Sequence, residues 1–222
     1  MKRAQREFGT VISHAQPSKK DHDASAQLDK FLRVMNLYED DEGSKHRKVV
    51  LRTLLDLVKE WSTKLGIDRG LPPEKAYPAT LKTFGSYNLK VHTPDADIDI
   101  LLLAPRHCTR EDFFTSLCDK LGDRTDVKEL FPVPGAYTPV IKFKLQGVSI
   151  DMLFCSLHYD RIPDSCNVHD DEHLRHLDDG GVRSLNGVRV VSMILQLLPQ
   201  NNRQSFRVAL RAIKEWARRR GV

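Results

Sequence analysis

Two aspartates stand in a stretch of sequence that is otherwise strongly apolar. The run from Asp97 to Leu103 predicts a buried strand. Side chains alternate between faces along a strand, so Asp97 and Asp99 point to one face while Ile98 and Ile100 point into the core. Two carboxylates on one face repel each other unless a cation lies between them, and Mg²⁺ and Mn²⁺ prefer such oxygen ligands. The pair therefore predicts a divalent-cation site, although Asp-x-Asp also occurs at turns and solvated strand ends.

A small turn precedes the aspartates. Residues 80–84 read as a strand that leads into Gly85-Ser86. Backbone N–H groups freed at a turn from strand to helix can hold phosphate oxygens, and Ser86 adds a hydroxyl. The alternative is an ordinary tight turn, which would be the better interpretation if the aspartates were not close by.

A third carboxylate lies in a predicted hairpin. Alternating apolar residues over 140–145 and 148–154 flank Gln146-Gly147, which is a hairpin signal. Asp151 occupies the middle of the second strand, where an unpaired carboxylate is costly to bury. If this strand lies beside the strand at 97–103, Asp151 completes a three-carboxylate cluster; the sequence alone does not establish that adjacency.

The rest of the chain reads mainly as helices. We expect a polar arm over 1–23, a helix over 24–38, a solvated acidic loop over 39–43 and a helix over 44–65 that ends at Gly66 and buries Trp61. Thr109 and Asp112 form a predicted capping box for a helix that runs to 122. A strand over 127–133 and helices over 183–198 and 205–220 complete the expected elements.

Two further clusters have a chemical and a plain interpretation. His169, His173 and His176 fall at helical spacing, which fits either a zinc site or a solvated helix face. The last helix is strongly basic, so it is either a solvated face or a contact for a triphosphate or an RNA backbone.

Bulk properties suit a soluble globular protein with a mildly basic surface. The chain has 222 residues, of which 40% are hydrophobic and 29% charged, and its net charge of +5 is compatible with a polyanionic partner. The four cysteines lack Cys-x-x-Cys spacing and read as reduced thiols of an intracellular protein. No apolar run is long enough for a signal peptide or a membrane span.

Taken together, the motifs resemble those of the nuclear eukaryotic poly(A) polymerases, in the DNA-polymerase-beta-like nucleotidyltransferase superfamily. The resemblance extends from about Phe8 to Val222. The motifs that carry it are Phe84-Gly85-Ser86-Tyr87, Asp97-Ile98-Asp99, Pro139-Val140-Ile141-Lys142, Ile150-Asp151, Arg183-Ser184-Leu185-Asn186-Gly187 and Leu210-Arg211-Ala212-Ile213-Lys214-Glu215-Trp216-Ala217.

The resemblance implies an α+β nucleotidyltransferase fold, with a mixed β-sheet flanked by helices and an incomplete α-helical middle domain. It implies an N-terminal arm and helix over 1–43, which we expect to pack on the middle domain, a catalytic domain over 44–165, and the start of the middle domain over 166–222. We therefore expect this chain to be a C-terminally truncated piece of a longer polypeptide.

The resemblance also implies a function, namely template-independent transfer of AMP from ATP to RNA 3′ ends in the nucleus, with two Mg²⁺ or Mn²⁺ ions. Protein partners would be cleavage and polyadenylation factors, and no membrane is involved. The family's catalytic, metal-binding aspartates fall on Asp97, Asp99 and Asp151. Its residues that contact the nucleotide or the primer end fall on Phe84, Gly85, Ser86, Tyr137, Lys142, Asn186 and Lys214.

This sequence departs from the family pattern at several positions. Asn88-Leu89-Lys90 replaces Arg-Leu-Gly, Val191-Ser192-Met193 replaces Thr-Asp-Glu, and Tyr137 replaces a phenylalanine. A Tyr and an Asn that hold the nucleotide in the family would follow Val222. The alternatives are a weakly active or inactive fragment that binds nucleotide or RNA, or another nucleotidyltransferase such as a terminal uridylyltransferase or an oligoadenylate synthase.

Overall fold

A mixed five-stranded sheet organises the chain, and its strands lie in the order β1, β2, β5, β4, β3. The structure is a computed structural model that describes residues 15–222. The strands are β1 (Thr80–Thr83), β2 (Ile98–Ala104), β3 (Val127–Val133), β4 (Val140–Leu145) and β5 (Val148–Ser156). Only β2 and β5 pair in parallel, and the other three pairings are antiparallel. This arrangement confirms the expected α+β fold class.

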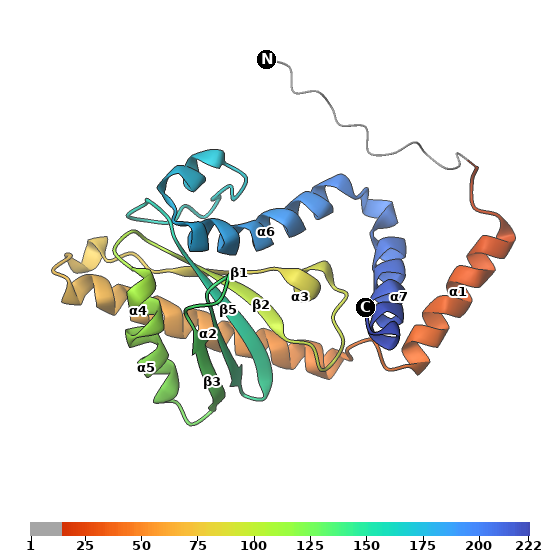
Figure 1. Ribbon diagram of the computed structural model, residues 1–222, viewed down its shortest axis with the longest axis horizontal. Coiled ribbons are helices and arrows are strands. Elements are labelled where there is room, and N and C mark those ends of the chain that lie inside the picture. The colour runs from red at the N-terminus through yellow and green to blue at the C-terminus, as the bar shows by residue number, and fades with distance from the viewer. Residues whose placement is uncertain (1–14) are drawn as a thin grey trace, which may run out of the picture.

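Helices cover both faces of the sheet (Figure 1). On one face, Ile98 and Ile100 of β2 pack with the buried stripe of α2 (Asp41–Asp68) and with Leu117 of α5 (Ser116–Gly122). On the other face, Leu101 and Leu103 pack against α6 (Asp179–Leu197). Burying each such side chain contributes about 1.5–3 kcal/mol, so β2 is held between two apolar layers.

The hairpin between β4 and β5 forms as predicted. Gln146 and Gly147 both have positive φ, at 51° and 84°. Positive φ at both central residues is what a two-residue turn needs to match the twist of its strands. The turn sets the register in which Lys142 of β4 stands opposite Asp151 of β5.

The first two helices begin earlier than the sequence predicts. α1 spans Lys19–Val34, because Ser18 and Asp21 form a capping box at its start. The expected acidic loop over 39–43 is wrong, since Asp40 caps α2 and Asp41 is its first residue. Acidic residues in the first turn stabilise a helix, because their charges interact favourably with the positive end of the helix dipole. α2 also continues past Gly66 to Asp68, with Trp61 buried as expected. The expected arm over 1–23 lies partly outside the described residues, and 19–23 are helical.

The helix predicted after Thr109 is split in two. The capping box between Thr109 and Asp112 is confirmed. The chain then departs from helical geometry at Thr115, where φ is −107° and ψ is −91°. The result is α4 (Arg110–Phe114) followed by α5.

The C-terminal part returns to the N-terminal helix. The C-terminal part contains the 3-10 helices η2 (Asp171–His176) and η3 (Gln200–Asn202), and then α7 (Arg203–Arg220). Earlier in the chain, a third 3-10 helix, η1, spans Pro73–Lys75. α1 contacts α7, so segments from both ends of the described chain lie side by side (Figure 1). No helix among residues 15–222 has the length and apolar character to cross a membrane.

Candidate active site

Asp99 and Asp151 stand side by side on adjacent parallel strands. In the register of β2 and β5, Asp99 is the partner of Asp151. Both side chains are half-buried, whereas the residues that precede and follow each of them are fully buried. Alternation therefore places both carboxylates on the face that α6 covers. The predicted adjacency of the two strands is confirmed.

Asp97 lies just outside the strand, because β2 begins at Ile98. The expectation that the strand includes Asp97 is therefore wrong by one residue. Asp97 is exposed, and its charge still reaches Asp99. Within residues 15–222, no three His, Cys, Asp or Glu side chains are arranged as ligands of a single metal ion. The three carboxylates share one region of the surface without closing into a ligand set.

Burial and the repulsion between carboxylates act together on Asp99. Burial, followed by the charges of Asp97 and Asp151, raises the pKa of Asp99 to about 6. Lys142 and Lys214 oppose that rise. Lys142 forms an ion pair with Asp151, and this contact raises the pKa of the lysine, with the charges of Asp97 and Asp99 adding to it. An ammonium group thus occupies the position of a cation among the carboxylates.

Gly85 allows Asp99 to lie directly against the turn. Gly85 begins the short helix α3 (Gly85–Leu89) with φ +60°, and a Cβ built on it would overlap the carboxylate of Asp99. The backbone N–H of Phe84 also donates to the carbonyl of Asp99 at 3.0 Å. The Gly85-Ser86 turn and the Asp99 carboxylate are therefore one packed unit.

α6 reaches the same region through close packing on Phe84. A Cβ at Gly187 would lie 2.6 Å from Cε2 of the Phe84 ring, so the helix backbone rests on that ring. Asn186, which precedes Gly187, is exposed. The structure thereby brings the segment that contains Asn186 against the Phe84-Gly85 turn.

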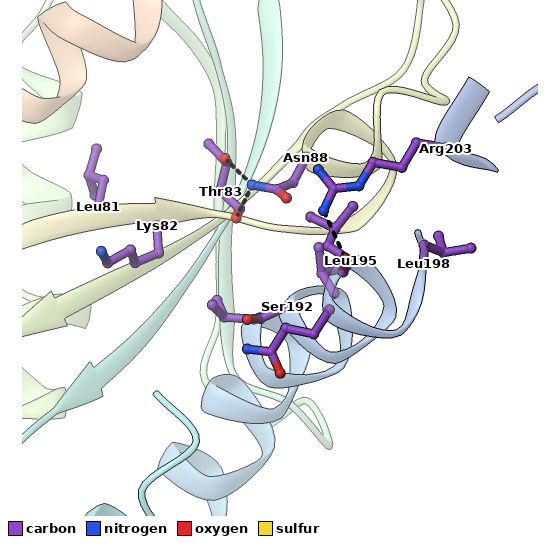
Figure 2. A pocket seen from close by; sticks show the side chains of 11 residues that line it. Leu81, Lys82, Thr83, Asn88, Ser192, Leu195, Leu198 and Arg203 are labelled. Atoms are coloured by element: carbon purple, nitrogen blue, oxygen red, sulfur yellow. Dashed lines mark hydrogen bonds between the residues drawn. The ribbon is translucent and has the colours of Figure 1, made fainter. Parts of the chain in front are cut away.

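A pocket of about 540 Å³ opens beside the turn, between β1 and the C-terminal half of α6 (Figure 2). Its lining includes none of the predicted site residues. Asn88 lines it and donates from Nδ2 to the carbonyl and hydroxyl of Thr83, both at 3.1 Å. Arg203 donates to the carbonyl of Leu195 at 2.9 Å. These contacts stabilise the ends of α3 and α6, so the residues of this pocket support the turn from behind.

Two further predicted residues, Tyr137 and Lys214, have exposed side chains. Tyr137 is 82% exposed, and the guanidinium of Arg183 on α6 lies 4.5 Å from its ring centroid. Lys214 lines a pocket of about 630 Å³ between α7 and the loop before Asp97. Thr93, in that loop, lines the same pocket. The structure therefore brings Lys142, Asp97, Asp99 and Asp151 together, and the charge of Lys214 on α7 also reaches Asp99.

The histidine cluster does not form a helical face. Residues 171–176 are a 3-10 segment, which breaks the spacing assumed for an α-helix. His173 is buried, and its Nε2 lies 3.0 Å from the carbonyl of Asn167 and 3.8 Å from Sγ of Cys166. His176 stacks on His158 at 4.7 Å. These contacts favour a structural role.

Several arginines of the basic helix α7 are already engaged in contacts within the protein. Arg218 and Arg219 both contact Glu215. Arg211 is buried, donates to the carbonyl of Lys90 at 2.9 Å and lies 4.0 Å from the ring centroid of Tyr38. Arg211 therefore belongs to the fold.

Sequence reasoning missed a buried ionic network beneath the loop that precedes Asp97. Glu39 forms an ion pair with Arg47, and its carboxylate lies 3.1 Å from Nε2 of His92 and accepts from the hydroxyl of Ser44 at 2.9 Å. One signal was present: Arg47 continues the apolar stripe of α2 that includes Val50 and Leu54, and a charged residue in a buried stripe requires partners.

The donor set fits a divalent cation. Carboxylate oxygens are the ligands that Mg²⁺ and Mn²⁺ prefer. Two features point to a cation: burial and the neighbouring charges of Asp97 and Asp151, which together raise the pKa of Asp99, and the Lys142 ammonium on Asp151. Gly85 leaves the space in which Asp99 faces the turn. A metal ion would require Lys142 to leave Asp151 and the exposed Asp97 to turn inward.

Three comparisons with known proteins bear on this site. A family model described as the poly(A) polymerase nucleotidyltransferase domain matches residues 9–198. The chain is 44% identical to nuclear poly(A) polymerase 1 of Arabidopsis thaliana, over 95% of this chain and 30% of that protein. It is 40% identical to poly(A) polymerase of Dictyostelium discoideum, over 95% of this chain and 26% of that protein. The chain thus spans less than a third of the length of these relatives.

Among solved structures, Cid1 in complex with a UTP analog is similar in backbone. The TM-score is 0.54 at 13% sequence identity, and the match covers 91% of this chain and 48% of that one. At this identity, the likeness shows a shared fold.

Proposed function

Because this chain belongs to the poly(A) polymerase nucleotidyltransferase-domain family, we propose that it supplies the catalytic part of an enzyme that adds AMP from ATP to RNA 3′ ends without a template. The observation that carries the proposal is the pairing of Asp99 with Asp151 across β2 and β5, packed against the Gly85 turn. Such a turn beside paired carboxylates suits a triphosphate with divalent cations.

We assign the carboxylates of Asp97, Asp99 and Asp151 to the binding of two Mg²⁺ or Mn²⁺ ions. When bound, these ions would neutralise the triphosphate and lower the pKa of the RNA 3′-hydroxyl. Asp97, Asp99 and Asp151 would hold these ions, with Asp151 on the side of the attacking hydroxyl. The protein's own contribution would be mostly the placement of the reactants and the stabilisation of charge.

The nucleotide would lie between the turn and the two C-terminal helices. Phe84, Gly85 and Ser86 would form its phosphate turn, while Asn186 on α6 and Lys214 on α7 would contact it from the other side. Support comes from the close packing of Gly187 on Phe84 and from the electrostatic reach of Lys214 to Asp99.

Tyr137 and Lys142 would meet the adenine or the primer end. Lys142 would leave Asp151 when the cations bind, and its ammonium would then be available to the RNA. Support comes from the position of Lys142 opposite Asp151 in the β4–β5 register.

We propose that residues 44–165 form the catalytic domain and that 166–222 begin a helical middle domain, with 1–43 packing on it. The contact between α1 and α7 supports this division. By likeness to a relative named as nuclear, we place the protein in the nucleus, with ATP, RNA and factors of cleavage and polyadenylation as partners.

The test is extension of a labelled RNA primer by this chain with each of the four nucleotides and Mg²⁺. We expect AMP incorporation that falls at least about 100-fold in Asp97→Ala, Asp99→Ala and Asp151→Ala, since even indirect support of a metal site contributes 10–100-fold. Asp119→Ala, which removes an exposed carboxylate from α5, is the matched control.

Retained Mg²⁺-dependent incorporation in any of the three aspartate variants would refute the assignment. Preferential incorporation of UMP would refute adenylyl transfer in favour of a terminal uridylyltransferase. Binding of Mn²⁺ by the chain, measured by calorimetry and lost in Asp99→Ala, is a second readout that does not depend on turnover.

A further inference from the structure

Asp97 is the least supported of the three carboxylates by regular structure. It is exposed and precedes β2, so only the residue after it, Ile98, has a partner in the strand pairing. The preceding residues form a turn in which the N–H of Ala96 donates to the carbonyl of Thr93 at 3.1 Å. A single turn of this kind opens readily unless other contacts hold it.

Arg47 provides those contacts from the buried side. Its Nη2 donates to the carbonyl of Pro94 at 2.8 Å and to that of Ala96 at 2.7 Å. The carbonyl of Ala96 belongs to the peptide group that includes the nitrogen of Asp97. A peptide group is planar, so a hydrogen bond that fixes this carbonyl also fixes the direction in which Asp97 leaves the loop.

Arg47 is itself held rigidly. Its side chain is 5% exposed and that of its partner Glu39 is 7% exposed. Glu39 also binds His92, at the start of the same loop, at 3.1 Å. Burial alone would raise the pKa of Glu39, but the hydrogen bonds from His92, Ser44 and Arg47 together lower it. Glu39 is therefore a charged anchor for both the arginine and the loop.

The charged pair has a geometric advantage over a simpler anchor. A planar guanidinium can donate to a carboxylate and to two carbonyls at once, which an ammonium on a flexible stem does not reproduce. A buried ion pair is a weak source of stability, because desolvation opposes the attraction. Its value here lies in where it holds the backbone.

We propose that Arg47, with Glu39 as its anchor, is a positioning residue that sets the backbone of Asp97 for cation binding. This inference rests on the proposed function, because it assigns Asp97 to the cation site. It adds Glu39, between α1 and α2, and Arg47, within α2, to the support of that site.

The test compares Arg47→Lys and Glu39→Gln with the wild-type chain by Mn²⁺ calorimetry. We expect Mn²⁺ binding about 10-fold weaker in each, the size of effect seen when the support of a metal ligand is removed. Arg52→Lys, the same change at an exposed position of α2, should bind as the wild type does. Leu121→Ala, which destabilises the core at buried α5, should also retain Mn²⁺ affinity while folded.

A second measurement separates this proposal from the proposed function. In Arg47→Lys, hydrogen exchange at the Ala96 amide, which donates to the carbonyl of Thr93, should accelerate about 10-fold, while exchange in β4 stays unchanged. Unchanged exchange at the Ala96 amide overturns the positioning role, whether or not the wild type binds Mn²⁺. If the wild type binds no Mn²⁺ but the Ala96 amide responds as expected, the cation site fails and the anchoring of the loop by Arg47 stands.

Wild-type Mn²⁺ affinity in both Arg47→Lys and Glu39→Gln would equally overturn the proposal. Should Arg47→Lys fail to fold, Glu39→Gln, which keeps the shape of the side chain, still decides between these outcomes.

Discussion

At the scale of single residues, the site depends on a glycine and a lysine as much as on its aspartates. Gly85 combines a positive φ with direct contact to Asp99, and Lys142 occupies Asp151. Gly85 determines where the carboxylate of Asp99 can lie, and Lys142 determines whether the carboxylate of Asp151 is free to bind a cation. Each makes a separate prediction.

Gly85→Ala should damage both stability and cation binding. A left-handed backbone costs an alanine about 1–2 kcal/mol, and its Cβ would displace the Asp99 carboxylate. We expect a lower midpoint of urea unfolding and Mn²⁺ affinity at least about 10-fold weaker. Gly135→Ala, where an added Cβ meets nothing within 4 Å, should leave both unchanged. Wild-type Mn²⁺ affinity in Gly85→Ala would show that Asp99 does not need its present position.

Lys142→Met should separate cation binding from catalysis. Removing the ammonium frees Asp151, and a partly exposed ion pair contributes up to about 1 kcal/mol, so Mn²⁺ should bind about 2- to 5-fold more tightly by calorimetry. Primer extension should nevertheless fall, because Lys142 is proposed to meet the RNA end. Lys144→Met, which instead breaks the pair with Glu129, is the control. Weaker Mn²⁺ binding in Lys142→Met would contradict the competition.

Much of this residue scale could be predicted from the sequence. Alternation along an apolar run was enough to place Asp99 away from the core, and a costly mid-strand position singled out Asp151. The two-residue turn of the hairpin also implies that Lys142 stands opposite Asp151, because it sets the register of the two strands. The contacts of Arg47 with the loop before Asp97 could not be predicted, because they depend on which distant segments become neighbours in space.

At the scale of elements, α6 is the helix that joins the site to the C-terminal part. Its backbone approaches Phe84 at Gly187, and Asp178, which caps its start, accepts two hydrogen bonds from Arg110 of α4, at 3.0 and 2.7 Å. A helix held at its N-terminus and against an aromatic ring has little freedom to shift across the sheet.

The contact between Gly187 and Phe84 predicts that the effect of Gly187→Ala on the free energy of unfolding depends on whether the Phe84 ring is present. Ala is favoured over Gly in a helix by about 1 kcal/mol, whereas overpacking a core costs about 1–3 kcal/mol. Gly187→Ala alone should therefore lower the free energy of unfolding measured in urea. In a Phe84→Leu background, which removes the ring, the same change should be neutral or stabilising.

A coupling below about 0.5 kcal/mol between the two sites would mean that the ring moves aside freely, because independent sites add within that margin. The expected coupling is larger, since the ring is packed between two apolar clusters.

Element types were more predictable than element boundaries. The hairpin and the capping box at Thr109 carry local chemistry that acts within a few residues, and both form as expected. The acidic residues at 39–43 were misread because acidic side chains suit both a solvated loop and the first turn of a helix. The break at Thr115 has no local breaker such as proline or glycine; nothing in the sequence there signals it.

At the scale of the whole molecule, Arg211 ties together three distant segments. It lies on α7, contacts the Tyr38 ring between α1 and α2, and donates to Lys90 at the end of α3. Tyr38 in turn donates to Asp29 on α1. The two ends of the described chain are therefore joined across one buried guanidinium.

Arg211→Met, which keeps the aliphatic stem and removes the charge, should lower the free energy of unfolding by about 2–3 kcal/mol. The charged hydrogen bond contributes about 1.5–3 kcal/mol and the contact with the ring about 1–2 kcal/mol, and the two are not fully additive. Urea unfolding measures the loss, and Arg220→Met at the exposed end of α7 is the control. Equal free energies of unfolding for the two variants would show that Arg211 does not stabilise the fold.

The contact between α1 and α7 also has a consequence for synthesis. A ribosome releases α1 early and α7 only after all the strands have been made, so the first helix must wait for its partner. During that interval α1 lacks the helix that it contacts in the folded chain, and a nascent chain that exposes apolar surface before its partner segment is made is prone to aggregation.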